Sequence, residues 1–449
     1  MTEALPGAAA GRWNARVWAL AGPIIISNLS TPLLGAVDTA VMGHLPDAAY
    51  IGGVAVGALI FNFLFWGFGF LRMGTTGFTA QAFGAGEADE LRAAFARPLA
   101  MGFLLGALLI ALQVPIALVA MPLIDASARV EALALAYFEI RIWSAPAALM
   151  NYAMLGWLLG VQRAGAVLFL QVTLNSINIL LSLLFVLGLG WGIEGVAAAS
   201  VIAEICAAVL GLVIVGRVLR GAGGAWDWDR VLKRERLVAL FRANLDILIR
   251  TLCLIFAFAY LTAQSATMGD VVLAGNAVLL QLQSFTAHGL DGFAHAAEIL
   301  AGSAYGARDR SAFRRAVAVS GAWALATSAL IAAIYLLGGQ AIIALFTDIE
   351  AVRASAEAYL PWLIVAPLIS IWGYQLDGIF IGTTRTAEMR NAMLASLAIY
   401  LVACWLLIPA MGNHGLWLAF TILSVARALS LALFYPRIER ALMPSVPTG

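Results

Sequence analysis

The segment TPLLGAVDTAVMGHL carries a single acid, Asp38, inside an otherwise apolar run. Thr31 lies seven residues earlier, on nearly the same face of a helix. A carboxylate in a low-dielectric cavity can bind and release a proton near the working pH, because burial disfavours its charged form. We therefore expect Asp38 to carry a proton, with two charge states that favour different conformations of the protein.

A second apolar run, 273–304, contains four titratable side chains at spacings of three, four and three residues, which place them on one helix face. They are His288, Asp291, His295 and Glu298. Histidine and carboxylates are suitable metal ligands, but residues seven apart lie about 10 Å apart along a helix, so one ion cannot collect all four. We expect this face to line a wet cavity and to relay protons, and we expect no metal site.

Amide and hydroxyl groups form a stripe with spacings of four, three and four residues: Gln171, Asn175, Asn178 and Ser182. Hydrogen bonding between helices and cavity lining explain this stripe equally well. In NLDILIRT, Asp246 and Arg250 are four residues apart and are expected to pair on one helix. Glu204 and Asp377 complete the expected cavity-lining set.

The elements that must position these groups lie in lipid. The chain has 449 residues, 63% of them hydrophobic and 11% charged, against about 45–50% and about 25% in soluble domains. An ionisable group at the bilayer centre costs at least about 2.5–3.5 kcal/mol, so each one is a functional candidate. The balance of 26 basic and 25 acidic residues argues against a nucleic-acid partner.

The apolar runs have the length of membrane-spanning helices rather than of barrel strands. We predict an all-α membrane protein of twelve spans: 15–42, 52–81, 95–120, 133–158, 165–188, 193–218, 238–265, 273–304, 314–338, 355–382, 390–409 and 414–436. With this count nearly all arginines and lysines outside the spans fall on the side of the N-terminus, so the positive-inside rule predicts that both termini are cytoplasmic. We expect no removable signal peptide, and we interpret the three cysteines as packing residues.

The two halves of the sequence resemble each other at a constant offset. Tyr137, Gly156, Gly160 and Arg163 recur 222 positions later as Tyr359, Gly378, Gly382 and Arg385, and Phe83-Gly84-Ala85 recurs at the same offset as Tyr305-Gly306-Ala307. We predict two parallel six-helix repeats, 1–222 and 237–449, joined by a cytoplasmic linker, 223–236. In carriers such repeats enclose a binding site near the middle of the membrane.

The segments TPLLGAVDTAVMGHL, NLDILIRT, GLDGFAHAAEILAGSAYGARD and LDGIFIGTTRTAEMRNAM resemble the MATE (multidrug and toxic compound extrusion) family, in particular its DNA-damage-inducible branch. The resemblance covers about 13–436. It implies two pseudo-symmetric six-helix lobes, V-shaped when open, in the inner membrane. It also implies export of cationic or amphipathic small molecules in exchange for H⁺ or Na⁺.

Within the family Asp38 matches the ion-responsive acid and Asn178 its partner, whereas Ser182 stands where several proton-coupled relatives have a second aspartate. Asp377 is similar in location to a Na⁺-binding acid of another branch. We expect a functional monomer with no cofactor and no catalytic residue. The alternatives are a lipid-linked precursor flippase and, from another class, an intramembrane metalloenzyme using the face from His288 to Glu298.

Overall fold

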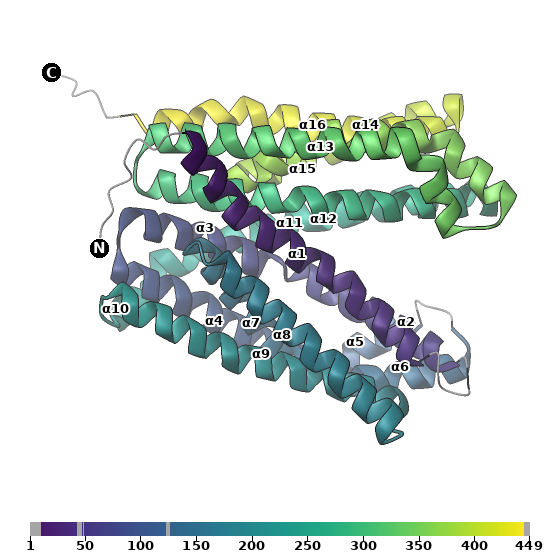
Figure 1. The fold of residues 1–449 in the computed structure, drawn as a ribbon, viewed down its shortest axis with the longest axis horizontal. Helices are drawn as coiled ribbons and strands as arrows, with labels where there is room; N and C mark the ends of the chain where they lie inside the picture. Colours follow the sequence, from purple (N-terminus) through teal and green to yellow (C-terminus); the bar gives the residue numbers. More distant parts are fainter. Residues whose placement is uncertain (1–9, 43–46, 48, 123–125, 444–449) are drawn as a thin grey trace. The chain divides into compact units, whose positions relative to one another are not determined.

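A computed structural model describes residues 10–42, 47, 49–122 and 126–443. In the first helix, α1 (Ala10–Met42), only the backbone is described at 10, 11, 31–34, 36, 38, 39 and 42. Every regular element in these described residues is helical (Figure 1). The prediction of an all-α protein is therefore confirmed.

The chain divides into two compact units. The N-terminal unit consists of Ile26–Phe83 and Glu87–Leu240, and the C-terminal unit consists of 10–25, Gly84–Gly86 and the described residues from Phe241 onward. The two units divide between Leu240 and Phe241, inside the helix that follows the predicted linker 223–236, and the first half of α1 groups with the C-terminal unit. In that unit the Trp18 ring meets the rings of Phe293 and Trp323 edge-on, each at 5.2 Å between centroids.

Helices of the N-terminal unit pack against one another as antiparallel neighbours, with α4 on α7 and α8 on α9 (Figure 1). After α1 they follow in the order α2 (Ala49–Gly67), α3 (Phe70–Ala85), α4 (Ala88–Ala111), α5 (Gln113–Ala120), α6 (Ala128–Arg141), η1 (Ile142–Ser144), α7 (Ala145–Gly160), α8 (Ala164–Leu183), η2 (Leu184–Gly188), α9 (Gly192–Ala222) and α10 (Trp228–Val231).

In the part of the chain that the structure describes, the C-terminal unit contains six long helices besides the first half of α1. They are α11 (Arg234–Thr267), which begins in the N-terminal unit, α12 (Asp270–Gly306), α13 (Arg310–Phe346), α14 (Glu350–Gly382), α15 (Thr386–Met411) and α16 (Asn413–Ala441). Helix α12 packs on α13 and α14, and α15 packs on α16. Trp417 and Tyr400 are among the largest fully buried side chains of its core.

Each of the twelve predicted spans corresponds to one helix or to a run of consecutive helices. Among the described residues, nine helical segments are long and apolar enough to cross a membrane, including Ala49–Ala85, which combines α2 and α3. The other three predicted spans correspond to α1, to α6 with α7, and to α12. The twelve-helix arrangement in two repeats is the one predicted from the sequence.

The internal repeat extends to backbone geometry. Gly156 of α7 lies so close to α3 that a Cβ there would come within 2.3 Å of the Arg72 carbonyl oxygen. Gly378 of α14 makes the same approach to the Ala294 carbonyl oxygen of α12, also at 2.3 Å. Both the glycines and the carbonyls are 222 positions apart. The same two helices of each repeat therefore pack through the same small residue, which lets backbones approach closely in a membrane.

The turns after these helices also repeat. Gln162 and Thr384, 222 positions apart, both have positive φ, 61° and 54°. The amide of the next residue closes the turn in each case: Arg163 N–H donates to the Leu158 carbonyl, and Arg385 N–H to the Phe380 carbonyl, both at 2.8 Å. Two residues that rarely adopt this conformation thus end equivalent helices in the two repeats.

Candidate functional site

The polar stripe of α8 is a hydrogen-bonded network that joins three helices of the N-terminal unit. Asn175 Nδ2 donates to Ser30 Oγ of α1 at 2.9 Å, and Asn178 Nδ2 donates to Ser200 Oγ of α9 at 2.9 Å. Ser182 Oγ donates to Asn178 Oδ1 at 3.2 Å. Of the two explanations that the sequence left open, hydrogen bonding between helices is present; whether the stripe also lines a cavity stays a prediction.

A second polar group of the N-terminal unit surrounds Glu204 of α9. Asn151 Nδ2 of α7 donates to Glu204 Oε2 at 2.7 Å and to the Glu204 carbonyl oxygen at 3.0 Å. The guanidinium of Arg141 lies within electrostatic range of this carboxylate and 5.4 Å from the Phe61 ring centroid. Cationic and anionic side chains are therefore both present inside this bundle.

The C-terminal unit contains a buried charge cluster built from three helices. The Asp377 carboxylate of α14 accepts hydrogen bonds from Arg250 of α11 and from Arg427 of α16. All three residues are at most 8% exposed. Tyr374 lies 5.6 Å below the Arg427 guanidinium, and Asp291 of α12 acts electrostatically on both arginines. The two guanidinium groups thus share one carboxylate that both contact, and buried charges require such pairing.

The predicted pairing of Asp246 with Arg250 is wrong. Asp246 instead accepts hydrogen bonds from Arg390 Nη1 at 2.6 Å and from Thr386 Oγ1 at 3.0 Å, both from α15. Arg250 pairs with Asp377. Spacing of four residues permits a pair along a helix, but each buried side chain here faces a different neighbouring helix that offers it a partner. The charge of each residue is therefore neutralised, as expected, but by a partner on another helix.

The titratable face of α12 consists of separate local contacts. His295 Nδ1 lies 2.9 Å from Glu298 Oε2, and this pair is buried. His288 Nδ1 lies 2.7 Å from the Ser284 carbonyl oxygen of its own helix, and Asp291 belongs to the environment of Arg250 and Arg427. Within the described residues no three His, Cys, Asp or Glu side chains form a group that could hold a metal ion.

Asp38 and Thr31 lie on α1, at positions where their side chains fall outside the described residues. The ion-coupling role of Asp38 therefore stays a prediction.

Uncharged amides that the sequence did not single out also build the interior of the C-terminal unit. Asn276 Nδ2 donates to Ser265 Oγ at 2.7 Å and to Asn413 Oδ1 at 2.8 Å, and Trp417 Nε1 donates to Asn276 Oδ1 at 2.9 Å. Gln283 and Arg427 line a small cavity of about 30 Å³ in the same unit. The only sequence signal for these residues is an amide within an apolar run.

Family comparison agrees with this architecture. A model of the MatE family matches the chain twice, over 23–184 and over 247–406, and together the two matches cover more than half of it. The matches begin 224 and end 222 positions apart, in line with the internal repeat. The chain is a multi-pass membrane protein of the MatE family, as the resemblance implied.

Two curated relatives illustrate the family. The chain is 44% identical to DNA damage-inducible protein F of Escherichia coli K12 over 425 residues, covering 94% of this chain and 92% of the relative. It is 26% identical to the probable multidrug resistance protein NorM of Caulobacter vibrioides, covering 91% and 88%. The predicted assignment to the DNA-damage-inducible branch is confirmed.

Solved structures share the fold. A MATE structure in a bent conformation aligns with a TM-score of 0.85 at 19% identity, covering 96% of this chain and 97% of that one. An outward-facing multidrug resistance MATE transporter aligns with a TM-score of 0.84 at 19% identity, covering 96% of each chain.

Proposed function

We propose that this protein is an efflux antiporter that exports cationic or amphipathic compounds across the inner membrane in exchange for protons. It works by alternating access, as a monomer, with both termini in the cytoplasm. One observation supports this most: two copies of one helical bundle occur in the same chain, matched in their Gly156 and Gly378 helix contacts. Each contains charged side chains between its helices, partly buried in the N-terminal unit and buried in the C-terminal unit. Carriers are built from such repeats, and the relative NorM is named as a probable multidrug resistance protein.

Asp38 is the proposed coupling residue. It matches the ion-responsive acid of the family, and α1 connects directly to the α8 network through Ser30 and Asn175. Antiport requires that the proton and the exported compound each prefer a different conformation, so that binding of one disfavours the other. The proton on Asp38 and the cationic cargo would then be mutually exclusive.

We choose the proton over Na⁺ as the coupling ion because the Asp377 carboxylate is already bound by two arginines. A Na⁺ site needs carboxylate or carbonyl oxygens with room for the ion. Both oxygens of Asp377 accept hydrogen bonds from Arg250 and Arg427, so a cation there would have to displace two guanidinium groups. Asp377 is therefore a poor Na⁺ ligand in this chain.

The test is transport in proteoliposomes under separately imposed pH and Na⁺ gradients, with a fluorescent organic cation as cargo. We expect a pH gradient alone to drive transport of the cation by the wild type, and we expect a Na⁺ gradient to leave the transport rate unchanged. Asp38→Asn should abolish this transport while the thermal midpoint of the purified protein stays unchanged.

Asp47→Asn is the matched control, since Asp47 lies in the loop after α1 and pairs with Arg129 at 2.6 Å. It should transport at the wild-type rate. Unimpaired transport by Asp38→Asn would remove Asp38 from the mechanism, and transport that follows only the Na⁺ gradient would overturn the choice of ion.

A further inference from the structure

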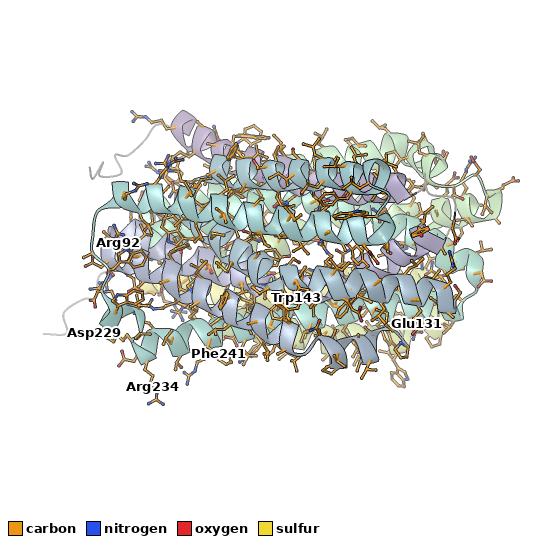
Figure 2. All side chains as sticks on the ribbon, turned by 90° about the horizontal axis from the view of Figure 1, so that it is seen from below. Arg92, Glu131, Trp143, Asp229, Arg234 and Phe241 are labelled. Atoms are coloured by element: carbon orange, nitrogen blue, oxygen red, sulfur yellow. The ribbon has the colours of Figure 1, made fainter. Side chains whose placement is uncertain are left out.

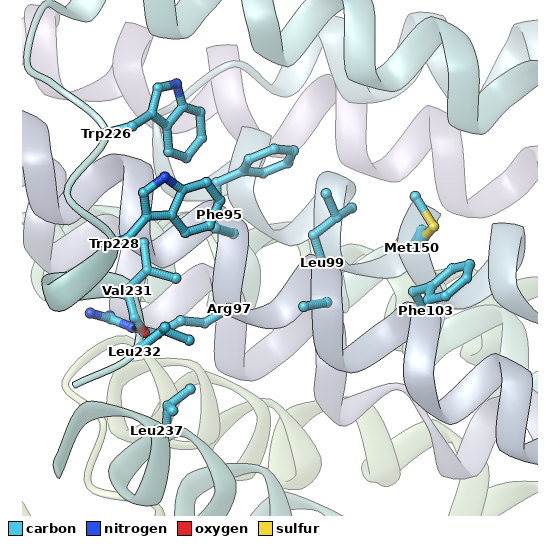
Figure 3. A pocket seen from close by; sticks show the side chains of 12 residues that line it. Phe95, Arg97, Leu99, Phe103, Met150, Trp226, Trp228, Val231, Leu232 and Leu237 are labelled. Carbon is cyan, nitrogen blue, oxygen red and sulfur yellow. Dashed lines mark hydrogen bonds between the residues drawn. The ribbon is translucent and has the colours of Figure 1, made fainter. Parts of the chain in front are cut away.

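An apolar groove of about 690 Å³ lies in the N-terminal unit between α4, α7 and the segment that leads into α11 (Figure 3). Its walls include Phe95, Leu99 and Phe103 of α4, and Trp226 and Trp228 of the linker. Of the twelve lining residues only Arg97 is polar. The volume is within the range of about 300–1,000 Å³ that is typical of sites for small ligands.

The linker wall of this groove is fixed by side chains of α4. Asp89 Oδ1 accepts a hydrogen bond from the Ala225 amide at 2.8 Å, and Arg92 Nη2 donates to the Gly223 carbonyl oxygen at 2.8 Å. Arg97 donates to the Val231 carbonyl oxygen at 3.0 Å and pairs with Glu90 at 2.7 Å. The single polar side chain of the groove is thus already satisfied, so the surface left for an occupant is hydrocarbon.

The groove follows the direction of a membrane span. From Phe95 to Phe103 it extends eight residues along α4, or about 12 Å. Trp226 and Trp228 stand at one end of it, with their rings stacked at 6.3 Å, and Phe103 lies toward the other end (Figure 3). Tryptophan is enriched where a membrane meets water. The groove therefore begins at an interface and continues into the hydrocarbon layer.

Basic residues gather at the tryptophan end. Arg230 is near Glu87 and Asp227, and Lys233 pairs with Glu235 at 3.2 Å. Arg234 and Arg236 are exposed and form no ion pair within the described residues. Arg234 lies one turn before the lining residue Leu237, on the same side of α11. Figure 2 shows Arg234 projecting from the end of this unit that also carries Arg92 and Asp229, away from Glu131.

We propose that this groove binds one anionic phospholipid of the adjacent membrane leaflet. One acyl chain lies along α4 between Phe95 and Phe103, and the phosphate contacts Arg234 and Arg236. Basic sites beside membrane helices attract anionic headgroups, whereas a cationic cargo would be repelled by the same two arginines. The positive-inside rule places this end at the cytoplasmic leaflet.

The headgroup contact is tested by native mass spectrometry of protein taken from bilayers of phosphatidylglycerol and phosphatidylethanolamine. We expect the wild type to retain one phosphatidylglycerol in preference to the zwitterionic lipid. The double substitution Arg234→Gln with Arg236→Gln should weaken this binding roughly 30-fold, the combined effect of two interfacial cations. The control pair Arg315→Gln with Arg437→Gln removes the same charge from helices of the C-terminal unit and should leave retention unchanged.

The acyl-chain contact is tested by filling the groove. Ala100 is an exposed lining residue of α4, so Ala100→Trp should expel the lipid, whereas Ala329→Trp at an exposed position of α13 should not. Equal retention by the Ala100 and Ala329 variants would overturn the location of the chain. Equal retention of the two lipids by wild type, or displacement of the lipid by an organic cation at transport concentrations, would overturn the assignment to an anionic phospholipid.

Discussion

Arg250 of α11 and Asp377 of α14 form a buried ion pair between residues 127 positions apart. Arg427 of α16 holds the same carboxylate, so one acid joins three helices of the C-terminal unit. A buried charge is stable only while its counter-charge is present, because removing either one leaves the other without water or partner. The cluster therefore fixes the relative positions of these helices.

Asp377→Asn is expected to destabilise the protein by about 3–5 kcal/mol, since two buried guanidinium groups lose their carboxylate. The thermal midpoint of detergent-purified protein, followed by size-exclusion chromatography after heating, measures this. Asp270→Asn at the exposed first turn of α12 is the control and should change the midpoint little. An unchanged midpoint in Asp377→Asn would show that the arginines find other partners.

Gly156→Ala and Gly378→Ala should destabilise to a similar degree, by about 1–3 kcal/mol, because a methyl group at either site collides with a backbone carbonyl. Gly216→Ala in α9 is the matched control, since nothing lies within 4 Å of a Cβ there. It should be neutral or stabilising by up to about 1 kcal/mol. The thermal midpoints of the three variants measure these effects. If Gly156→Ala lowered the midpoint and Gly378→Ala did not, the two repeats would not pack in the same way.

Asn178 and Ser200 should show a coupling free energy of about 0.6 kcal/mol, the usual size for hydrogen bonds between membrane helices. The measurement is a double-mutant cycle with Asn178→Ala, Ser200→Ala and the double variant, using the free energy of unfolding in mixed detergent. Transport per folded molecule is measured alongside. Zero coupling together with altered cargo preference would instead favour the cavity-lining explanation of the α8 stripe.

Glu439, near the end of α16, gives a pH-dependent contribution to stability. Hydrogen bonds from Arg314 and then from Arg310 lower the pKa of its carboxyl, so the folded state favours the ionised form. The contribution is present above the unfolded pKa of about 4.3 and is lost as the pH falls through the lower folded value.

Glu439→Gln should therefore lower the thermal midpoint at pH 7. The loss of free energy of unfolding should be at most about 1 kcal/mol, because both arginines are exposed to water. The difference from wild type should shrink as both proteins are acidified below a pH of about 4. A difference that stays constant with pH would mean that packing of the side chain, not its charge, is responsible.

Several features follow from the sequence because they depend on local composition. An apolar run of about 20 residues must be a helix in lipid, since its backbone can be satisfied only within the segment. The spans, the repeat at 222 positions and the family resemblance can therefore all be predicted from the order of the residues alone. The turn at Gln162 and its counterpart at Thr384 are a structural consequence of that same repeat.

Partnerships between distant residues did not follow from the sequence. Asp246 and Arg250 have a spacing that allows a pair, yet Asp246 binds Arg390 and Arg250 binds Asp377. Nor does the sequence indicate that the first half of α1 packs with the C-terminal unit, or that Trp226 and Trp228 form a groove with α4.

The sequence by itself thus determined that this chain crosses the membrane as two related helical bundles of the MatE family. Tertiary structure decided which buried charge neutralises which, and where the linker docks. The physical reason is range: a span is set by residues within one helix, whereas the partner of a buried side chain is set by which helix faces meet, and those faces come from segments more than a hundred residues apart.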